Sequence, residues 1–141
     1  CFYYLEFAKK IIEGADKWAA YNQLQLELSS YFENRGINPK EVANFNRLLK
    51  EDISKLDEDA IKSSGYVIHT LEASIWCILT THSYKEAVLK AVNLGEDTDT
   101  TAAVTGGMAG LIYGLNSIPE EWLEVVARKK DIINLSEKLK A

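Results

Sequence analysis

The segment Asp97-Thr98-Asp99-Thr100 places two carboxylates and two hydroxyl groups within four residues. Side chains that share a helical face lie three or four positions apart, so Asp97 and Asp99 belong in a loop or in the first turn of a helix. At a helix N-terminus, the unpaired backbone N–H groups and the positive end of the dipole tolerate clustered carboxylates and let a hydroxyl such as that of Thr100 face outward. Carboxylate and hydroxyl oxygens bind hard cations such as Mg²⁺, Mn²⁺ or Ca²⁺. The tetrad therefore predicts a cation site at the start of a helix.

The tetrad has three other interpretations. Asp and Thr are common N-cap residues, and capping alone would explain one of the four positions. An EF-hand loop that began at Asp97 would need glycine and glutamate where the chain has Ala102 and Met108. The D-x-D-x-T loop of haloacid-dehalogenase-type phosphatases follows a buried strand, whereas the apolar residues of segment 87–94 recur at helical spacing. The cation site at a helix start stays the preferred interpretation.

Glycines recur along the helix that follows the tetrad. Every fourth residue is small, at Ala102, Gly106, Gly110 and Gly114, and Gly107 lies beside them. Four interior glycines cost about 3–4 kcal/mol relative to alanine. We expect close approach of another helix backbone to compensate for this cost and to hold the acidic loop rigidly.

Composition restricts the class of protein. The 141 residues are 47% hydrophobic, which suits one domain spanning residues 1–141. The net charge of −5 disfavours nucleic-acid partners and anionic membrane surfaces. No apolar run is long enough to cross a bilayer and no signal-peptide pattern is seen, so a cytoplasmic protein is predicted. Cys1 and Cys77 both lie in apolar runs and are expected to be reduced thiols in the core.

Apolar residues recur at helical spacing almost everywhere, so the predicted fold is all-α. In the first helix, Phe2, Leu5, Ala8, Ile11 and Ile12 are expected to face the core. Helices are predicted at about 2–13, 16–34, from Pro39 through Leu49, at 66–80, 83–93, across the glycine-rich segment to 115, from Pro119, and at 131–140.

Two further groups of residues could do chemistry. Ser64-Gly65-Tyr66 combines a glycine break with an aromatic ring at a helix start, and exposed N–H groups beside a flat ring can hold a nucleotide base or a phosphate. His69 lies one turn before Glu72 and could be a titrating base near neutral pH. A hydrogen-bonded helix histidine is the simpler interpretation of His69.

The chain resembles the ADP-ribosylglycohydrolase family, which includes the dinitrogenase reductase activating glycohydrolase. The resemblance rests on four segments: SGYVIHTLEA at 64–73, AVNLG at 91–95, DTDTTAA at 97–103 and the glycines from 106 to 114. It implies an all-α, orthogonally packed helical bundle that holds two Mg²⁺ or Mn²⁺ ions. It also implies a hydrolase that removes ADP-ribose from modified arginine of proteins, or in some branches from serine or small ADP-ribosyl compounds.

The resemblance also implies roles for individual residues. Asp97, Asp99 and Thr100 would form one half of the dinuclear metal site, and Asp97 and Asp99 would also position water and relay a proton. The segment 64–66 would line the adenosine end of the substrate.

The chain departs from the family pattern in two ways. Glu96 stands where the family usually has a second glycine, and the family's N-terminal half, with its Thr-Asp-Asp segment, is absent. We therefore expect a fragment that corresponds to the C-terminal half and is inactive without a complementing N-terminal segment. Unpaired apolar helix faces would favour a homodimer. The alternative is a non-catalytic relative that binds ADP-ribose or acts as a scaffold.

Overall fold

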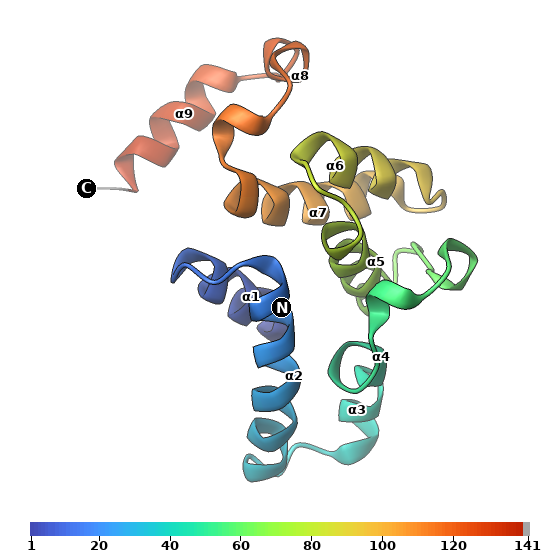
Figure 1. Cartoon of the computed structure of the whole chain (residues 1–141). Coiled ribbons are helices and arrows are strands. Elements are labelled where there is room, and N and C mark those ends of the chain that lie inside the picture. Colours follow the sequence, from blue (N-terminus) through green and yellow to red (C-terminus); the bar gives the residue numbers. More distant parts are fainter. Residues whose placement is uncertain (140–141) are drawn as a thin grey trace.

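The computed structural model describes residues 1–139, and this part of the chain is helical without a strand. The predicted all-α fold is therefore confirmed. Along the chain, Figure 1 shows α1 (Phe2–Ile12), α2 (Lys17–Asn34), α3 (Pro39–Ala43), α4 (Asn46–Leu49), α5 (Val67–Leu79), α6 (Tyr84–Asn93), α7 (Thr98–Tyr113), α8 (Glu120–Glu124) and α9 (Lys129–Lys138). Short 3-10 turns lie at Ile53–Lys55, Glu58–Ala60 and Leu115–Ser117.

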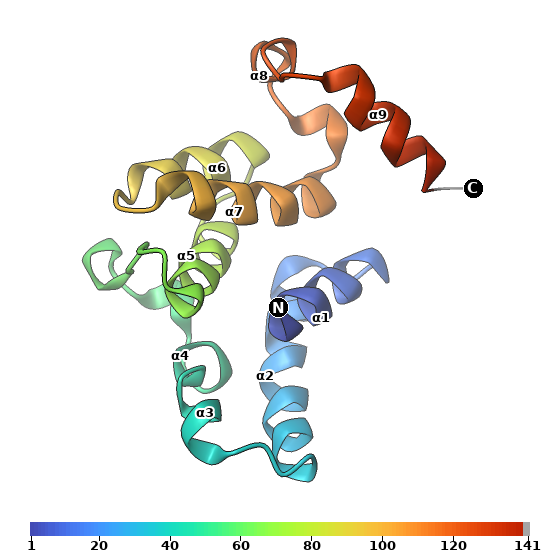
Figure 2. The same ribbon diagram turned by 180° about the vertical axis from the view of Figure 1, so that it is seen from behind.

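Helix α5 is the centre of the molecule. From Ile68 to Leu79 every residue except His69 is buried, and a helix that is buried on all sides needs partners on all sides. Helices α6 and α7 pack on α5 and along each other, and α2 and the turn at Ile53–Lys55 also contact α5. Figures 1 and 2 show α6 and α7 side by side over one end of α5, with α3 and α4 toward the other end.

Side chains cap the starts of α2 and α6. Asp16 accepts hydrogen bonds from the backbone N–H groups of Trp18 and Ala19, the second and third residues of α2, at 2.8 and 3.0 Å. Ser83 accepts one from Glu86 N at 3.2 Å, which begins α6. These side chains satisfy N–H groups that the first turn of a helix leaves unpaired.

The interior-facing side of α1 agrees with the prediction at Ala8, which is buried, and at Ile11, which packs against the core, but differs at three other residues. Phe2, Leu5 and Ile12 are 39%, 61% and 71% exposed, whereas Tyr3 and Phe7 are buried. The larger aromatic pair, four residues apart, fills the core, and apolar residues also cover the opposite side of the helix. Cys77 is buried as predicted, but Cys1 lies exposed at the start of α1, so its assignment to the core was wrong.

The glycines of α7 meet side chains rather than backbone, contrary to the prediction. A Cβ on Gly106 would lie 3.3 Å from the Tyr84 hydroxyl, and one on Gly107 would lie 2.9 Å from the Tyr4 hydroxyl. A Cβ on Gly110 would meet nothing within 4 Å. Two phenol groups, from α6 and α1, therefore occupy the space that the first two glycines leave.

One ion pair is largely buried between α4 and α5. Arg47 Nη1 lies 2.9 Å from Glu72 Oε2, and the two side chains are 28% and 4% exposed. Arg47 also donates to Ala60 O at 2.8 Å. Burial raises the pKa of Glu72, and the charge of Arg47 opposes this rise. The pair ties the 58–60 turn and α4 to the central helix.

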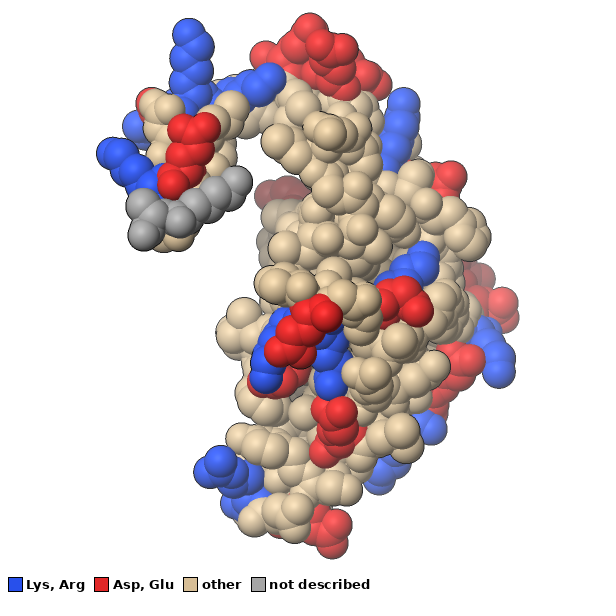
Figure 3. Space-filling view, turned by 60° about the vertical axis from the view of Figure 1, so that its left-hand side comes forward, with Lys and Arg blue, Asp and Glu red and all other residues tan. Residues whose placement is uncertain are grey.

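The C-terminal helices add nothing to the core. No residue of α8 or α9 is buried, and the apolar side chains of Val125, Ile132, Leu135 and Leu139 are 82%, 56%, 63% and 82% exposed. In Figure 3 this C-terminal arm stands off from the body of the molecule. Between residues 1 and 139, none of the helices is both long and apolar enough to span a bilayer.

Replacing Arg47 by alanine should lower the free energy of unfolding by about 3 kcal/mol at pH 7, because a buried carboxylate loses its partner. A raised carboxyl pKa favours the protonated form in the folded state. The loss of unfolding free energy in Arg47→Ala is therefore present above the folded pKa of Glu72. It should shrink as the pH falls toward 4.5, the ordinary pKa of a glutamate side chain. Urea unfolding at pH 7 and pH 5 measures both effects.

The matched control is Arg128→Ala. It removes an arginine that pairs with Asp131 at a similar distance, 2.8 Å, but with the arginine side chain 81% exposed. A loss of about 0.5 kcal/mol or less is expected there. Equal losses in the two variants would contradict the role assigned to burial.

Replacing Gly110 by alanine should stabilise the fold by about 0.5–1 kcal/mol, because the site is open and alanine is the better helix former. Gly107→Ala should gain less or lose stability, since the Tyr4 hydroxyl must move and its 3.3 Å hydrogen bond to Val104 O is disturbed. Thermal unfolding of the two variants gives the comparison. A larger gain at Gly107 would show that the Tyr4 contact does not constrain α7.

Candidate metal and substrate site

The acidic tetrad lies at the start of α7, where the sequence predicted it. Asp97 is the N-cap residue and Asp99 lies in the first turn. The side chain of Asp97 makes no capping hydrogen bond, so its carboxylate is not used for the helix start. Asp99 Oδ1 accepts the neighbouring Thr100 N–H at 2.8 Å. Capping alone therefore does not account for this segment.

The two carboxyl groups interact with each other. Interaction with the Asp97 side chain, followed by the hydrogen bond from Thr100 N–H, lowers the pKa of Asp99 below its usual value. The donor chemistry here, carboxylate oxygens with the exposed Thr100 beside them, suits a hard cation.

The loop before α7 has an unusual backbone. Gly95 and Glu96 both have positive φ, at 82° and 54°. Glycine adopts this left-handed region freely, whereas a side chain makes it costly. Glu96 is the position at which the resemblance led us to expect glycine, and its left-handed backbone is a conformation that suits glycine.

The segment Ser63–Tyr66 docks against this loop. Asp97 N donates to Ser63 O at 3.1 Å, and Ser63 Oγ donates to Gly95 O at 2.8 Å. A Cβ on Gly65 would lie 3.0 Å from Asp97 Oδ2. The absence of a side chain at Gly65 therefore leaves room for the Asp97 carboxylate. The fold thus brings together the two groups that the sequence singled out, although they are about 30 residues apart in the chain.

The other two residues of the predicted substrate segment have defined surroundings. Ser64 Oγ lies 2.7 Å from His69 Nδ1, and the Ser64 carbonyl accepts a 3.4 Å hydrogen bond from Thr70. Tyr66 is the N-cap residue of α5 and is 52% exposed. Its ring meets the edge of His69 with centroids 5.1 Å apart. The exposed ring offers a flat apolar surface one residue after Gly65.

His69 is a hydrogen-bonded helix histidine, as the simpler interpretation had it. It is half-buried and bonds to Ser64, while Glu72 pairs with Arg47 instead. Sequence analysis treated His69 only as a possible base and did not include Ser63. The contacts of Ser63 with Gly95 and Asp97 depend on how α5 and α7 pack.

The part of the chain that the structure describes holds only a partial set of cation ligands. Within residues 1–139, no group of three or more His, Cys, Asp or Glu side chains is placed to hold a metal ion. Asp97 and Asp99 provide two carboxylates, and Thr100 follows them directly. The residues therefore fit one side of a divalent cation and leave the other side to water or to further ligands.

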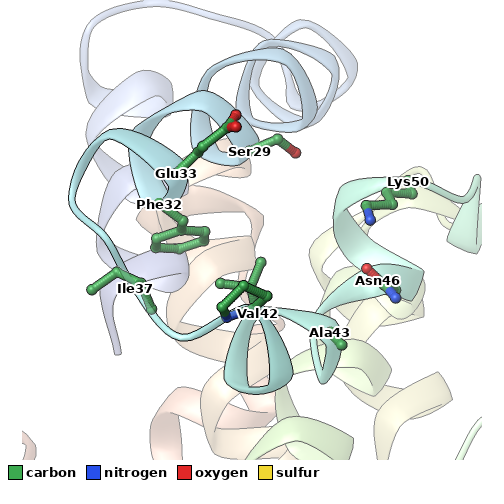
Figure 4. A pocket seen from close by; sticks show the side chains of 9 residues that line it. Ser29, Phe32, Glu33, Ile37, Val42, Ala43, Asn46 and Lys50 are labelled. Carbon is green, nitrogen blue, oxygen red and sulfur yellow. The ribbon is translucent and has the colours of Figure 1, made fainter.

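Two cavities lie away from these residues. One of about 280 Å³ lies between α2, α3 and α4, and in Figure 4 its apolar side chains Phe32, Ile37 and Val42 lie near one another. The other, about 540 Å³, includes Lys17 and Tyr113 in its lining. The Lys17 ammonium group already donates to Ile78 O, Thr81 O and the Tyr113 hydroxyl, so it has a structural role. The candidate site is therefore a surface between two helix starts.

The family model and three similar proteins that match this chain all carry the names of ADP-ribosyl hydrolases. The model of the ADP-ribosylglycohydrolase family matches residues 1–141. The chain is 48% identical over 81 residues to the ADP-ribosylarginine hydrolase Tri1 of Serratia proteamaculans, covering 57% of this chain and 22% of that protein. It is 35% identical over 68 residues to the ADP-ribosyl-[dinitrogen reductase] glycohydrolase of Rhodospirillum rubrum, covering 48% and 23%. It is 28% identical over 119 residues to the ADP-ribosylhydrolase ARH3 of Bos taurus, covering 71% and 33%. The chain thus spans about a fifth to a third of the length of these relatives.

Replacing Glu96 by glycine should stabilise the fold by about 1 kcal/mol, because it removes a side chain from a left-handed backbone position. Glu13→Gly is the matched control, since Glu13 is also exposed but has φ of −74° at the end of α1. That change should lower stability, because glycine at this position only increases the conformational entropy of the unfolded chain. Urea unfolding of both variants tests the prediction, and a loss of stability at both positions would contradict it.

Proposed function

Because this chain belongs to the ADP-ribosylglycohydrolase family, we propose that it carries part of the active site of a hydrolase that releases ADP-ribose from ADP-ribosylated arginine of proteins. The arginine linkage is taken from relatives that are named ADP-ribosylarginine hydrolase. Small ADP-ribosyl compounds are the other substrates to test. Residues 1–141 would form the C-terminal portion of one such domain.

The observation that carries this proposal is the contact between the two predicted segments. Gly65 lies directly beside the Asp97 carboxylate, and Ser63 is hydrogen-bonded to the loop that presents Asp97. The exposed aromatic ring of Tyr66 therefore follows, by one residue, the position that contacts the half-buried Asp97 carboxylate, and the exposed Asp99 lies in the first turn of the same helix start. Such an arrangement can contact the base at one end of a nucleotide and a cation at the other.

Asp97, Asp99 and Thr100 would hold Mg²⁺ or Mn²⁺, two ions in the complete family site. A divalent cation, when bound, supplies positive charge. This charge stabilises the negative charge that develops on the leaving nitrogen as its bond to ribose C1″ breaks. The carboxylates of Asp97 and Asp99 would orient the attacking water and accept its proton. The released guanidine nitrogen takes up a proton, so the products are ADP-ribose and unmodified arginine.

The chain is proposed to supply half of this site. Mg²⁺ keeps its waters unless several carboxylates replace them, and the described residues offer two. The remaining ligands would come from a complementing segment of the kind present in the longer relatives, or from a second copy of the chain. Chain 1–141 alone would then bind cations weakly and turn over little substrate.

A second candidate is a non-catalytic relative that binds ADP-ribose. It is favoured by the small number of carboxylates that the described part of the chain brings together. A binder that does not depend on a cation should keep its affinity for ADP-ribose when either aspartate becomes asparagine. Cation dependence therefore separates the two candidates.

Replacing Asp97 or Asp99 by asparagine should abolish Mn²⁺ binding and lower ADP-ribose release by at least about 100-fold, since a cation ligand is lost. Release from ADP-ribosyl-arginine is measured with and without Mg²⁺ or Mn²⁺, before and after addition of a complementing N-terminal segment from a longer relative. Mn²⁺ binding is followed by electron paramagnetic resonance. Activity is expected only after complementation.

The matched control is Asp16→Asn, which makes the same change at another helix N-terminus. Asparagine caps helices as well as aspartate does, so this variant should behave as the unmodified chain. Full activity of the isolated chain would contradict the half-site proposal. Unchanged activity of Asp97→Asn and Asp99→Asn would contradict the role of the carboxylates.

A further inference from the structure

The hydrogen bond between Ser64 and His69 is the shortest contact that holds the substrate segment in place. Ser64 Oγ and His69 Nδ1 are 2.7 Å apart, and they belong to the loop before α5 and to its first turn, respectively. Both residues are half-buried. His69 is also the only residue between Ile68 and Leu79 that is not buried. Its ring therefore points away from the core, toward the loop.

Three further contacts fix the same loop. Tyr66 N donates to Ser64 Oγ at 3.4 Å, and Thr70 Oγ1 donates to Ser64 O at the same distance. The Tyr66 ring meets the edge of the His69 imidazole. The two neighbours of Ser64 contact the loop before α7: Ser63 is hydrogen-bonded to Gly95 and Asp97, and Gly65 lies beside the Asp97 carboxylate. A shift of Ser64 would therefore also displace Asp97.

We propose that His69 is a positioning residue, which acts through Ser64 to hold the 64–66 segment against Asp97. The proposal rests on the assignment of this segment to substrate binding. It adds a residue, His69, that lies outside the predicted set of substrate contacts. The role needs no change in the charge of the imidazole, because either tautomer can bond to the serine hydroxyl.

The same geometry limits what Ser64 can offer a ligand. A hydroxyl oxygen has one donor position and two acceptor positions. His69 takes one of the three and Tyr66 N takes an acceptor position, so one position remains. A ribose hydroxyl of ADP-ribose suits that position, because it can donate or accept according to the tautomer of His69.

The first test needs no ligand and follows backbone amide exchange at Tyr66 and Asp97 by NMR. His69→Leu and His69→Gln should speed exchange at both amides several-fold, because the loop loses its anchor. His69→Asn should leave exchange close to that of the unmodified chain, since its amide group occupies the place of Nδ1. The amide of His82, which donates to Glu86 at 2.8 Å, is the internal control and should not change.

Unchanged exchange at Tyr66 and Asp97 in His69→Gln would overturn the proposal. Should His69→Leu fail to fold, the pair His69→Asn and His69→Gln decides the outcome. These two side chains have the same amide group and differ by one methylene, so a difference between them reports the position of the hydrogen bond.

The second test measures ADP-ribose affinity by calorimetry with Mn²⁺ present, in the complemented protein. His69→Gln should weaken ADP-ribose binding about tenfold. His69→Asn should bind ADP-ribose within about threefold of the affinity of the unmodified protein. In the Ser64→Ala background, His69→Gln should cause no further loss, because its effect passes through Ser64. Additive losses in the double variant would overturn the proposal.

The two tests also separate this inference from the proposed function. If the chain does not bind ADP-ribose at all, the proposed function fails, while amide exchange still decides whether His69 anchors the loop. If Asp97→Asn abolishes binding and His69→Gln does not, the proposed function stands and the role of His69 is wrong.

Discussion

Two hydrogen bonds between Ser63 and the loop 95–97 join the start of α5 to the start of α7, and the candidate site depends on them. They can form only because α5 and α7 pack together over a long stretch. This packing fixes the position of one helix start relative to the other. The buried face of α5 therefore does more than fill the core. It sets the distance between Gly65 and the Asp97 carboxylate.

Local signals predicted much of this arrangement. The start of α6 at Ser83 follows from a short-range hydrogen bond within four residues, and the start of α7 at the acidic tetrad follows from residue types that suit a helix N-terminus. The contact between Gly65 and Asp97 has no such signal, because it joins residues that only the packing of α5 on α7 brings together. The family resemblance assigned both segments to one site, but it did not predict a contact between them.

The errors in the sequence interpretation have a common physical origin. In α1, apolar residues occupy both sides of the helix, so the spacing alone did not show that Phe2, Leu5 and Ile12 would be exposed. In α7, small residues predicted close approach of a backbone, whereas the hydroxyl ends of Tyr4 and Tyr84 occupy the space. Periodicity identifies a helix, but the partner that covers each face is decided by the whole fold.

Charge provides a further argument about the candidate site. ADP-ribose carries a negative diphosphate, while the surface proposed to bind it presents the Asp97 and Asp99 carboxylates in a chain of net charge −5. Like charges repel, and the positive helix N-terminus offsets only about half an elementary charge. A nucleotide diphosphate can approach this pair closely only when a cation balances the carboxylates. Cation binding and substrate binding should therefore be coupled at this site, because each reduces the electrostatic cost of the other.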